Sequence, residues 1–263
     1  VVRYKLRICK YKEFYAERRK IEMNIKVDTH SHTLVSGHAY STIQEMAKMA
    51  REHGMEAIAF TEHAPKMPGT CGIFYFENLK IVPRERYGIK MLFGTELNIM
   101  DSEGTVDMRD GLLKHLDIVI ASIHTPCFCG ERTKEAVTRA YVNVMKNPYI
   151  NIIGHPDDSR FPIDYEVLVK TAKETGTLLE VNNSSLREDN KRENADENIR
   201  VMLEYCKKYE VPITTGSDSH LDLDAGKLNL AEQILTECHF SGRIDRHNII
   251  RKIETICESI QKN

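Results

Sequence analysis

Short apolar runs alternate with longer segments along this chain. The runs are continuous rather than alternating in polarity, which is typical of parallel strands that are buried on both faces of a sheet. The pattern predicts seven strands, at residues 25–27, 57–60, 89–93, 117–122, 149–153, 177–181 and 211–215. Each strand is followed by a helix or by a connection of helical length.

The connecting segments show helical periodicity. Ser41 and Gln44 have the spacing of a capping box, with Ser41 as N-cap, and Gly54 has the position expected just after a helix. Residues 71–87 contain Pro83 and are poorly periodic, so we expect a long loop with a broken helix. Helices are predicted at residues 41–53, 133–147, 165–175 (closed by Gly176), 193–209, 228–238 and 245–260.

This alternation predicts an α/β fold, and the chain length favours a closed barrel over an open sheet. An open doubly wound sheet would need a glycine-rich phosphate loop after its first strand, which this sequence lacks. No linker appears within residues 25–263. Residues 1–24, with a strand-like alternation and then a charged stretch, are predicted to be an N-terminal extension.

Composition excludes several classes of protein. The net charge is −2 over 263 residues, so we expect neither nucleic-acid binding nor membrane binding from overall charge. No apolar run is long enough to span a membrane, and no secretory signal is recognisable. Seven irregularly spaced cysteines indicate a reducing compartment, and we expect a cytoplasmic protein. Cys127 and Cys129 lack the second pair that a zinc ribbon needs.

Histidines and carboxylates gather where the predicted strands end. His30 and His32 follow the first strand, and their alternate spacing aims both imidazoles the same way. The carboxyl ends of parallel strands form one rim, which is where ligands bind in such folds. The rim set comprises His30, His32, His38, His63, Glu96, His124, His155, Asp218 and His220.

Nine such residues exceed the needs of one metal ion, so we expect two or three ions. Without ions, neighbouring imidazoles would compete for donors and clustered carboxylates would repel one another. Multi-metal sites of this composition hydrolyse phosphate esters, because the ions generate hydroxide near neutral pH and clamp phosphate oxygens. The remaining histidines, His53, His115, His239 and His247, lie outside this set.

The motifs, taken in order, resemble those of the PHP (polymerase and histidinol phosphatase) superfamily, and most closely its YcdX-like phosphatases. The resemblance runs from Lys26 to His220 and predicts a PHP metal-dependent phosphoesterase domain over residues 25–263. The motifs are HSH at 30–32, HAYST at 38–42, TEH at 61–63, GTE at 94–96, His124, HP at 155–156, EVNNSS at 180–185 and GSDSH at 216–220.

The resemblance implies a distorted (β/α)7 TIM-like barrel with a trinuclear metal site, usually zinc, that hydrolyses a phosphomonoester. Glu96 would bridge two ions, and Glu96 and Asp218 are the expected catalytic carboxylates. One ion would be held by His30, His32, Glu96 and Asp218, a second by Glu96, His124 and His155, and a third by His38, His63 and His220. Manganese or iron would suit the same donors. The chain departs from the family pattern at Glu62, where aspartate is common, and at Asp157–Asp158.

A small phosphorylated substrate and a phosphate product are the expected ligands. Arg160 is the first candidate for a substrate contact and catalytic cation, ahead of Lys66, Arg187 and Lys227. Asn182 and Asn183 are candidates for substrate contacts or for support of the ligands, and loop capping is the alternative.

Three alternatives remain open from the sequence. The first is another phosphoester, such as histidinol phosphate or a nucleic-acid end. The second is an amidohydrolase or deaminase on a similar barrel, although no lysine lies at a strand end where it would bridge two ions. The third is a metal-binding regulatory module without enzymatic activity.

Overall fold

A computed structural model describes residues 25–240, 242 and 244. The predicted extension at residues 1–24 and the predicted helix at residues 245–260 lie outside the described residues.

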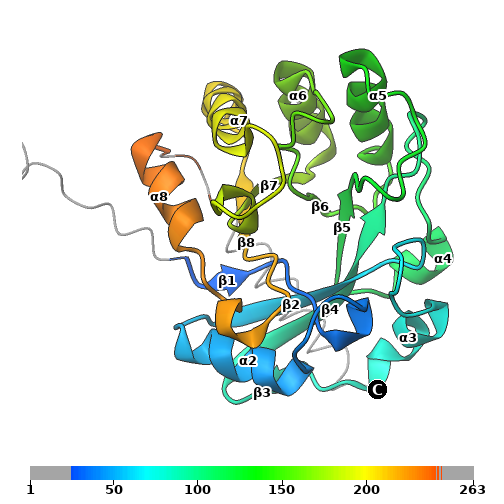
Figure 1. Ribbon diagram of the computed structural model, residues 1–263, viewed down its shortest axis with the longest axis vertical. Coiled ribbons are helices and arrows are strands. Elements are labelled where there is room, and N and C mark those ends of the chain that lie inside the picture. The colour runs from blue at the N-terminus through cyan, green and yellow to red at the C-terminus, as the bar shows by residue number, and fades with distance from the viewer. Residues whose placement is uncertain (1–24, 241, 243, 245–263) are drawn as a thin grey trace, which may run out of the picture.

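Seven parallel strands form the centre of the fold (Figure 1). They lie in chain order, with every neighbouring pair parallel. The strands are β1 (Val27–Asp28), β2 (Ala57–His63), β4 (Ile89–Asn98), β5 (Ile118–Ser122), β6 (Ile152–Ile153), β7 (Leu178–Asn182) and β8 (Ile213–Gly216). A short additional strand, β3 (Glu85–Arg86), pairs antiparallel with β4.

The first and last strands meet and close the sheet. The backbone N–H of Thr29 donates to the carbonyl oxygen of Thr215 at 3.2 Å, and Ser31 forms a parallel bridge with Ser219. The predicted closed, distorted seven-stranded barrel is therefore confirmed. Closure also brings residues 30–32 beside residues 218–219, which lie almost two hundred positions later in the chain.

Helices surround the barrel, as Figure 1 shows. They are α2 (Ile43–Glu52), α3 (Ile73–Asn78), α4 (Asp110–Leu113), α5 (Lys134–Val144), α6 (Tyr165–Thr175), α7 (Ala195–Tyr209) and α8 (Asn229–Glu237). Short 3-10 turns, η1 (Leu34–Ser36), η2 (Leu79–Ile81), η3 (Ser184–Leu186) and η4 (Asp222–Asp224), lie in the loops. No helix among the described residues is both long and apolar enough to cross a membrane.

The described residues form two apolar cores. The larger core packs helix residues against strand residues. The smaller core consists only of strand residues, such as Ala57 and Ala59 of β2 and Ile118 and Ile120 of β5, whose alternate spacing places them on one face. This smaller core fills the barrel near the beginnings of its strands and leaves the carboxyl ends to polar side chains.

Most predicted helices are confirmed, but the first begins one residue later than predicted. Thr42 is the N-cap of α2 and forms the capping box with Glu45. Ser41 is engaged elsewhere: its hydroxyl donates to Asp222 Oδ1 at 3.0 Å and accepts from the Asp222 backbone N–H at 2.9 Å. A contact from a distant loop therefore decides which hydroxyl caps the helix.

Several strand boundaries differ from the prediction. Strand β2 continues to His63 and β4 to Asn98, because polar residues at their ends are buried in the site rather than exposed. Strand β6 is shorter than predicted, because the Asn147 side chain accepts the Tyr149 N–H at 2.9 Å and holds that segment in a turn. The broken helix at residues 71–87 is confirmed as α3 and η2, but strand β3 was not predicted.

Candidate metal centre

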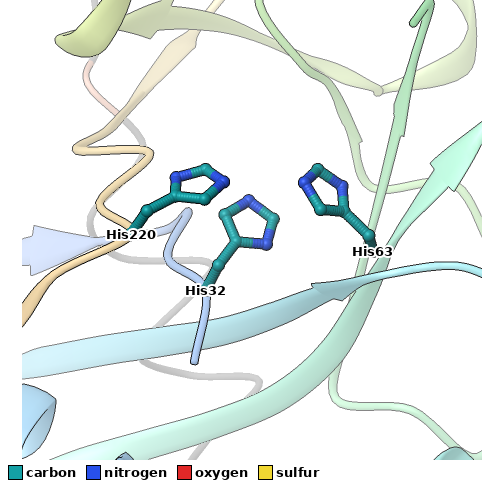
Figure 2. Close-up of side chains that lie close together, drawn as sticks. All are labelled: His32, His63 and His220. Carbon is teal, nitrogen blue, oxygen red and sulfur yellow. The ribbon is translucent and has the colours of Figure 1, made fainter. Parts of the chain in front are cut away.

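All nine residues of the rim set converge at the carboxyl end of the barrel. Figure 2 shows His32, His63 and His220 with their rings turned toward one another, although they come from the loop after β1, from β2 and from the loop after β8. The ring centroid of His32 lies 4.1 Å from that of His63 and 4.5 Å from that of His220. Three groups of potential metal ligands overlap here: His32, His63 and His220; His30, His32 and Glu96; and His63, Glu96 and His124.

Glu96 occupies the middle of the cluster and is fully buried. Its Oε1 lies 2.8 Å from His155 Nε2 and 3.1 Å from His124 Nε2. Its Oε2 lies 3.4 Å from His30 Nε2 and 3.5 Å from His32 Nε2. The two oxygens thus face two different pairs of imidazoles, as a carboxylate does when it bridges two ions.

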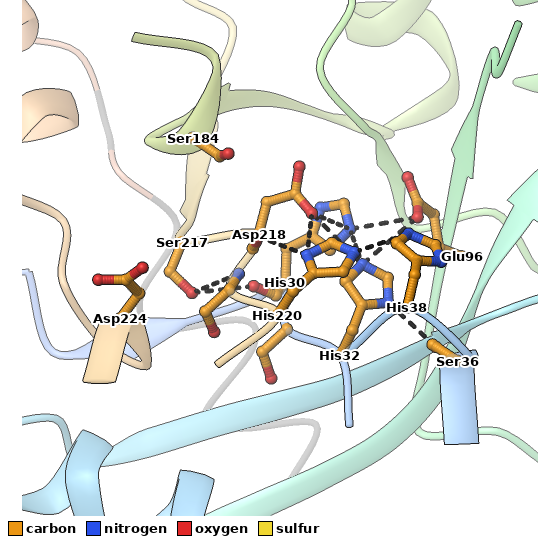
Figure 3. Close-up of polar contacts among 12 residues, drawn as sticks. His30, His32, Ser36, His38, Glu96, Ser184, Ser217, Asp218, His220 and Asp224 are labelled. Carbon is orange, nitrogen blue, oxygen red and sulfur yellow. Dashed lines mark hydrogen bonds and ion pairs between the residues drawn. The ribbon is translucent and has the colours of Figure 1, made fainter. Parts of the chain in front are cut away.

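Asp218 stands opposite Glu96 across the same pair of imidazoles (Figure 3). Its Oδ1 lies 3.7 Å from His30 Nε2 and 3.4 Å from His32 Nε2, while those two nitrogens are 3.0 Å apart. Two imidazoles and two carboxylates therefore surround one point. Four ligands of these types suit a divalent transition-metal ion.

The nitrogens of His38, His63 and His220 lie close together at the outer side of the cluster. His38 Nε2 is 3.2 Å from His63 Nε2 and 3.1 Å from His220 Nε2. His63 also connects this group to the centre, because its Nδ1 lies 2.8 Å from Glu96 Oε2. His63 and Glu96 therefore connect these outer nitrogens to the imidazoles around Glu96.

Hydrogen bonds behind the cluster fix the imidazole tautomers. The Nδ1 of His30 lies 2.9 Å from Glu180 Oε1, and that of His124 lies 2.8 Å from Asn98 Oδ1. The Nδ1 of His220 lies 3.0 Å from the Asp218 carbonyl oxygen. Because each acceptor requires a proton on Nδ1, the Nε2 lone pair of each ring points into the cluster. Lone pairs at 3.0–3.7 Å from other lone pairs and carboxylates repel unless a cation lies between them.

Burial and neighbouring charges set the protonation states. Burial lowers the pKa of His63 to about 4 and also lowers those of His32 and His155. Burial alone would raise the pKa values of Glu96 and Asp218, but the surrounding imidazoles lower both well below their usual range. For His30, burial lowers the pKa but the carboxylates of Glu180, Glu96 and Asp218 raise it well above its usual value. Neutral imidazoles and ionised carboxylates are the states in which such groups bind metal ions.

Strained backbone accompanies two members of the set. His155 has a φ of 29° and Asp218 a φ of 52°, a backbone region that residues other than glycine rarely adopt. Such strain persists where surrounding contacts over-determine the conformation, and it is common at functional sites. Here the backbone N–H of His155 donates to Glu180 Oε2 at 2.8 Å, and that of Asp218 donates to the His30 carbonyl at 2.8 Å.

Glu180, Asn98 and Arg192 support the cluster, and none of them has a role predicted from the sequence. A charged residue inside the buried strand run at 177–181 was a usable signal for Glu180. Asn98 lies beyond the predicted end of its strand. Arg192 Nη2 donates to Asp218 Oδ2 at 3.0 Å, and its Nη1 donates to Ser185 Oγ at 2.8 Å. Arg192 lies in a polar loop, where nothing in the local sequence distinguishes it.

Of the residues at the departures from the family pattern, Glu62 and Asp157 are buried, and Asp158 is half-buried. Glu62 accepts hydrogen bonds from the hydroxyls of Thr33 and Ser36, both at 2.6 Å, so its carboxylate braces the loop that carries His32. Burial raises the pKa of Glu62 to about 7 and that of Asp157 likewise to about 7.

The predicted substrate contacts take several different positions. Arg160 lines a cavity of about 190 Å³ next to His124 and His155, but its guanidinium is held by Asp158. Arg187 and Lys227 line a second cavity, beside His220. Lys66 lines neither of these cavities.

The two predicted asparagines have different roles. Asn182 Nδ2 donates to Asp218 Oδ2 at 3.2 Å and supports that carboxylate. Asn183 Oδ1 instead accepts the N–H groups of Leu230 and Ala231 at the start of α8, which is the capping alternative.

Among the described residues, the other histidines and the cysteines do not join the groups of potential metal ligands. His53 is the C-cap of α2, and its Nδ1 lies 2.7 Å from the Ala225 carbonyl. His115 and His239 join none of the ligand groups found among the described residues, nor does any cysteine there. His247 lies outside the described residues.

Comparison with known proteins identifies the relatives of this chain. The PHP domain family matches residues 28–213. A probable phosphatase of Thermoanaerobacter sp. (strain X514) is 45% identical over 232 residues, which cover 88% of this chain and 94% of that protein. A probable phosphatase of Acetivibrio thermocellus is 40% identical over 232 residues, covering 88% of this chain and 95% of the relative. These relatives confirm the predicted family resemblance and the predicted enzyme class, a phosphatase.

A solved structure with a similar fold is the histidinol phosphate phosphatase of Lactococcus lactis subsp. lactis, in complex with zinc, L-histidinol and phosphate. It superposes with a TM-score of 0.60 at 20% identity, covering 83% of this chain and 95% of that structure. At this identity the likeness shows a shared fold.

Proposed function

We propose, on the premise that this chain belongs to the PHP domain family, that it hydrolyses a phosphomonoester at a centre of three divalent metal ions, with zinc as the expected metal. The observation that carries this proposal is the convergence of imidazole Nε2 lone pairs on the buried Glu96 carboxylate. A buried arrangement of this kind is unfavourable unless cations occupy it.

We assign each ion to the group of ligands that its distances define. His30, His32 and Asp218 would hold one ion together with Glu96, whose second oxygen would reach a second ion held by His124 and His155. The nitrogens of His38, His63 and His220 would hold the third. Imidazole and carboxylate ligands suit zinc, manganese and iron.

Bound divalent ions would supply Lewis acidity, which activates water and neutralises phosphate oxygens. The protein contributes orientation. Glu180 and Asn98 hold the rings of His30 and His124 through Nδ1, and Arg192 and Asn182 hold Asp218 through Oδ2. A set of groups fixed in this way does not need to reorganise as charge develops on the substrate.

Charge favours a phosphomonoester as the substrate. Three bound dications next to the ionised Glu96 and Asp218 would leave a strongly positive centre, which would attract a dianionic phosphate far more than a neutral amide. The cavities at His124 and at His220 give room for a substrate on either side of the cluster.

Metal analysis combined with a phosphatase assay tests this proposal. We expect close to three metal equivalents per chain and turnover of p-nitrophenyl phosphate. Glu96→Ala should abolish turnover and reduce metal content, because it removes the carboxylate shared by two ions. Glu174→Ala, an exposed carboxylate on α6, is the matched control. Fewer than two bound ions, or unchanged turnover in the Glu96 variant, would contradict the proposal.

A further inference from the structure

Two cavities flank the candidate metal centre, and they differ in size and chemistry. The cavity beside His124 and His155 has about 190 Å³, and its wall combines apolar residues such as Ile123 and Phe161 with the charged residues Asp158, Arg160 and Arg192. The cavity beside His220 has about 470 Å³, a volume in the range that small metabolites occupy in proteins. The larger cavity is therefore the better place for the part of a substrate that extends beyond the phosphate.

Hydroxyl and amide groups line this larger cavity. Ser184, Ser217 and Asp224 lie on one flank of the histidine cluster, as Figure 3 shows. Ser219 Oγ also belongs to the lining; it is buried and has no hydrogen-bond partner among the described residues. A buried hydroxyl without a partner is costly, so it indicates a polar group that arrives with a ligand or with water.

An aromatic ring stands at the mouth of the same cavity. Tyr40 has 76% of its surface exposed and lines the cavity. Its backbone N–H donates to the His220 carbonyl at 2.9 Å, so the backbone that carries the ring is held beside His220. An exposed aromatic face beside polar groups suits a ligand with one apolar face and several hydroxyls.

The charges in the cavity cancel one another. Asp224 accepts from Arg187 Nη1 at 2.9 Å and lies 3.4 Å from Lys227 Nζ. Arg187 is also held by Asp189, at 2.9 and 3.0 Å. The two cations of the lining are thus matched by Asp224, which also lines the cavity, and by Asp189, which lies outside the lining. Away from the metal centre, an anionic tail would find no net positive charge among these side chains, and an ammonium group would meet two cations beside Asp224.

We propose that the larger cavity binds the alcohol part of the substrate, and that this alcohol is neutral and polyhydroxylated, as in a sugar phosphate. This inference rests on the proposed phosphatase function and adds the class of leaving group. Its hydroxyls would bond to Asp224 and to the serines, and its carbon face would lie against Tyr40. The cations and hydroxyls of the lining can donate hydrogen bonds to such a ligand, and the carboxylate and hydroxyls can accept them. A neutral ligand leaves the paired charges of the cavity balanced.

The test compares phosphomonoesters that differ only in the class of their alcohol part. The probes are ribose 5-phosphate (neutral and polyhydroxylated), 3-phosphoglycerate (anionic) and phosphoethanolamine (cationic), with p-nitrophenyl phosphate as the reference. The metal-loaded protein should show the highest kcat/KM with ribose 5-phosphate, by about tenfold or more over the two charged probes, which is the effect of one charge-assisted hydrogen bond.

Two variants locate the effect in this cavity. Asp224→Asn should lower kcat/KM for ribose 5-phosphate about tenfold and raise that for 3-phosphoglycerate, because Arg187 and Lys227 lose their shared carboxylate. Tyr40→Ala should raise the KM for ribose 5-phosphate with little change in kcat, and Tyr40→Phe should restore it. Asp196→Asn, which breaks an exposed ion pair with Arg200 on α7, is the matched control.

The outcomes separate this inference from the proposed function. Preference for a charged probe, or an unchanged kcat/KM for ribose 5-phosphate in both the Asp224 and Tyr40 variants, overturns the inference while p-nitrophenyl phosphate turnover shows an intact phosphatase. If metal-loaded protein hydrolyses none of the four esters, the proposed function fails and this inference fails with it.

Discussion

Glu180→Gln tests whether the hydrogen bonds behind the cluster control metal binding. The substitution keeps the size of a fully buried side chain and removes its charge. Glu180 now accepts from His30 Nδ1 at 2.9 Å through one oxygen, and from the His155 N–H at 2.8 Å and Asn182 Nδ2 at 3.1 Å through the other. Both oxygens therefore face donors, and an amide can satisfy only one side.

Either orientation of the glutamine has a cost. If its NH2 group faces His30, Nδ1 must become the acceptor, the proton moves to Nε2, and the lone pair that points toward His32 Nε2 is lost. If its oxygen faces His30, the NH2 group meets the donors of His155 and Asn182. Leaving buried donors unsatisfied costs about 1–3 kcal/mol. Loss of such a ligand-orienting partner typically weakens metal binding about 10–100-fold, or about 1.4–2.7 kcal/mol.

The charge on Glu180 adds to this effect. Burial would lower the pKa of His30, but Glu180, and after it Glu96 and Asp218, raise it well above its usual value. The carboxylate thus stabilises positive charge at His30, whether from a proton or from an ion. A neutral amide supplies much less of this stabilisation.

The assay is titration of the metal-free protein with zinc against a chromophoric chelator, with metal content measured by mass spectrometry. Glu166→Gln is the matched control, because Glu166 on α6 is paired with Lys208 on α7 at 3.1 Å rather than with a residue of the cluster. We expect weaker binding of at least one zinc ion in the Glu180 variant and wild-type binding in the Glu166 variant. Wild-type zinc affinity in Glu180→Gln would refute the reasoning.

Two further substitutions test other parts of the site. His38→Ala should lose one of three metal equivalents and keep the other two, because His38 is exposed and contacts only the outer nitrogens; metal analysis showing all three ions, or none, would contradict this. Gly216→Ala would place a Cβ 2.2 Å from Glu180 Oε1 and 2.4 Å from the Cβ of His30, so it should destabilise the protein by about 1–3 kcal/mol in chemical denaturation. Gly111→Ala, where a Cβ meets open space, is the control, and equal stability of the two variants would count against this packing argument.

The sequence was sufficient to identify the barrel and the residues at its rim. Continuous apolar runs separated by amphipathic segments already specify parallel strands with helical connections, and α6 has the predicted bounds of Tyr165–Thr175. Because all parallel strands end at one edge, histidines after several strands must meet there. His30, His63 and His155 could be grouped without knowing any distance between them.

The tertiary structure alone decided how that group is organised. The tautomer of His30 depends on Glu180, which is 150 positions away in the sequence, and Asp218 is held by Arg192 from a loop with no local signature. Likewise, Ser41 does not cap α2, because Asp222 engages its hydroxyl from another loop. The local pattern of a chain determines its secondary structure, whereas hydrogen-bond partners depend on closure of the barrel, which brings distant side chains within 3 Å of one another.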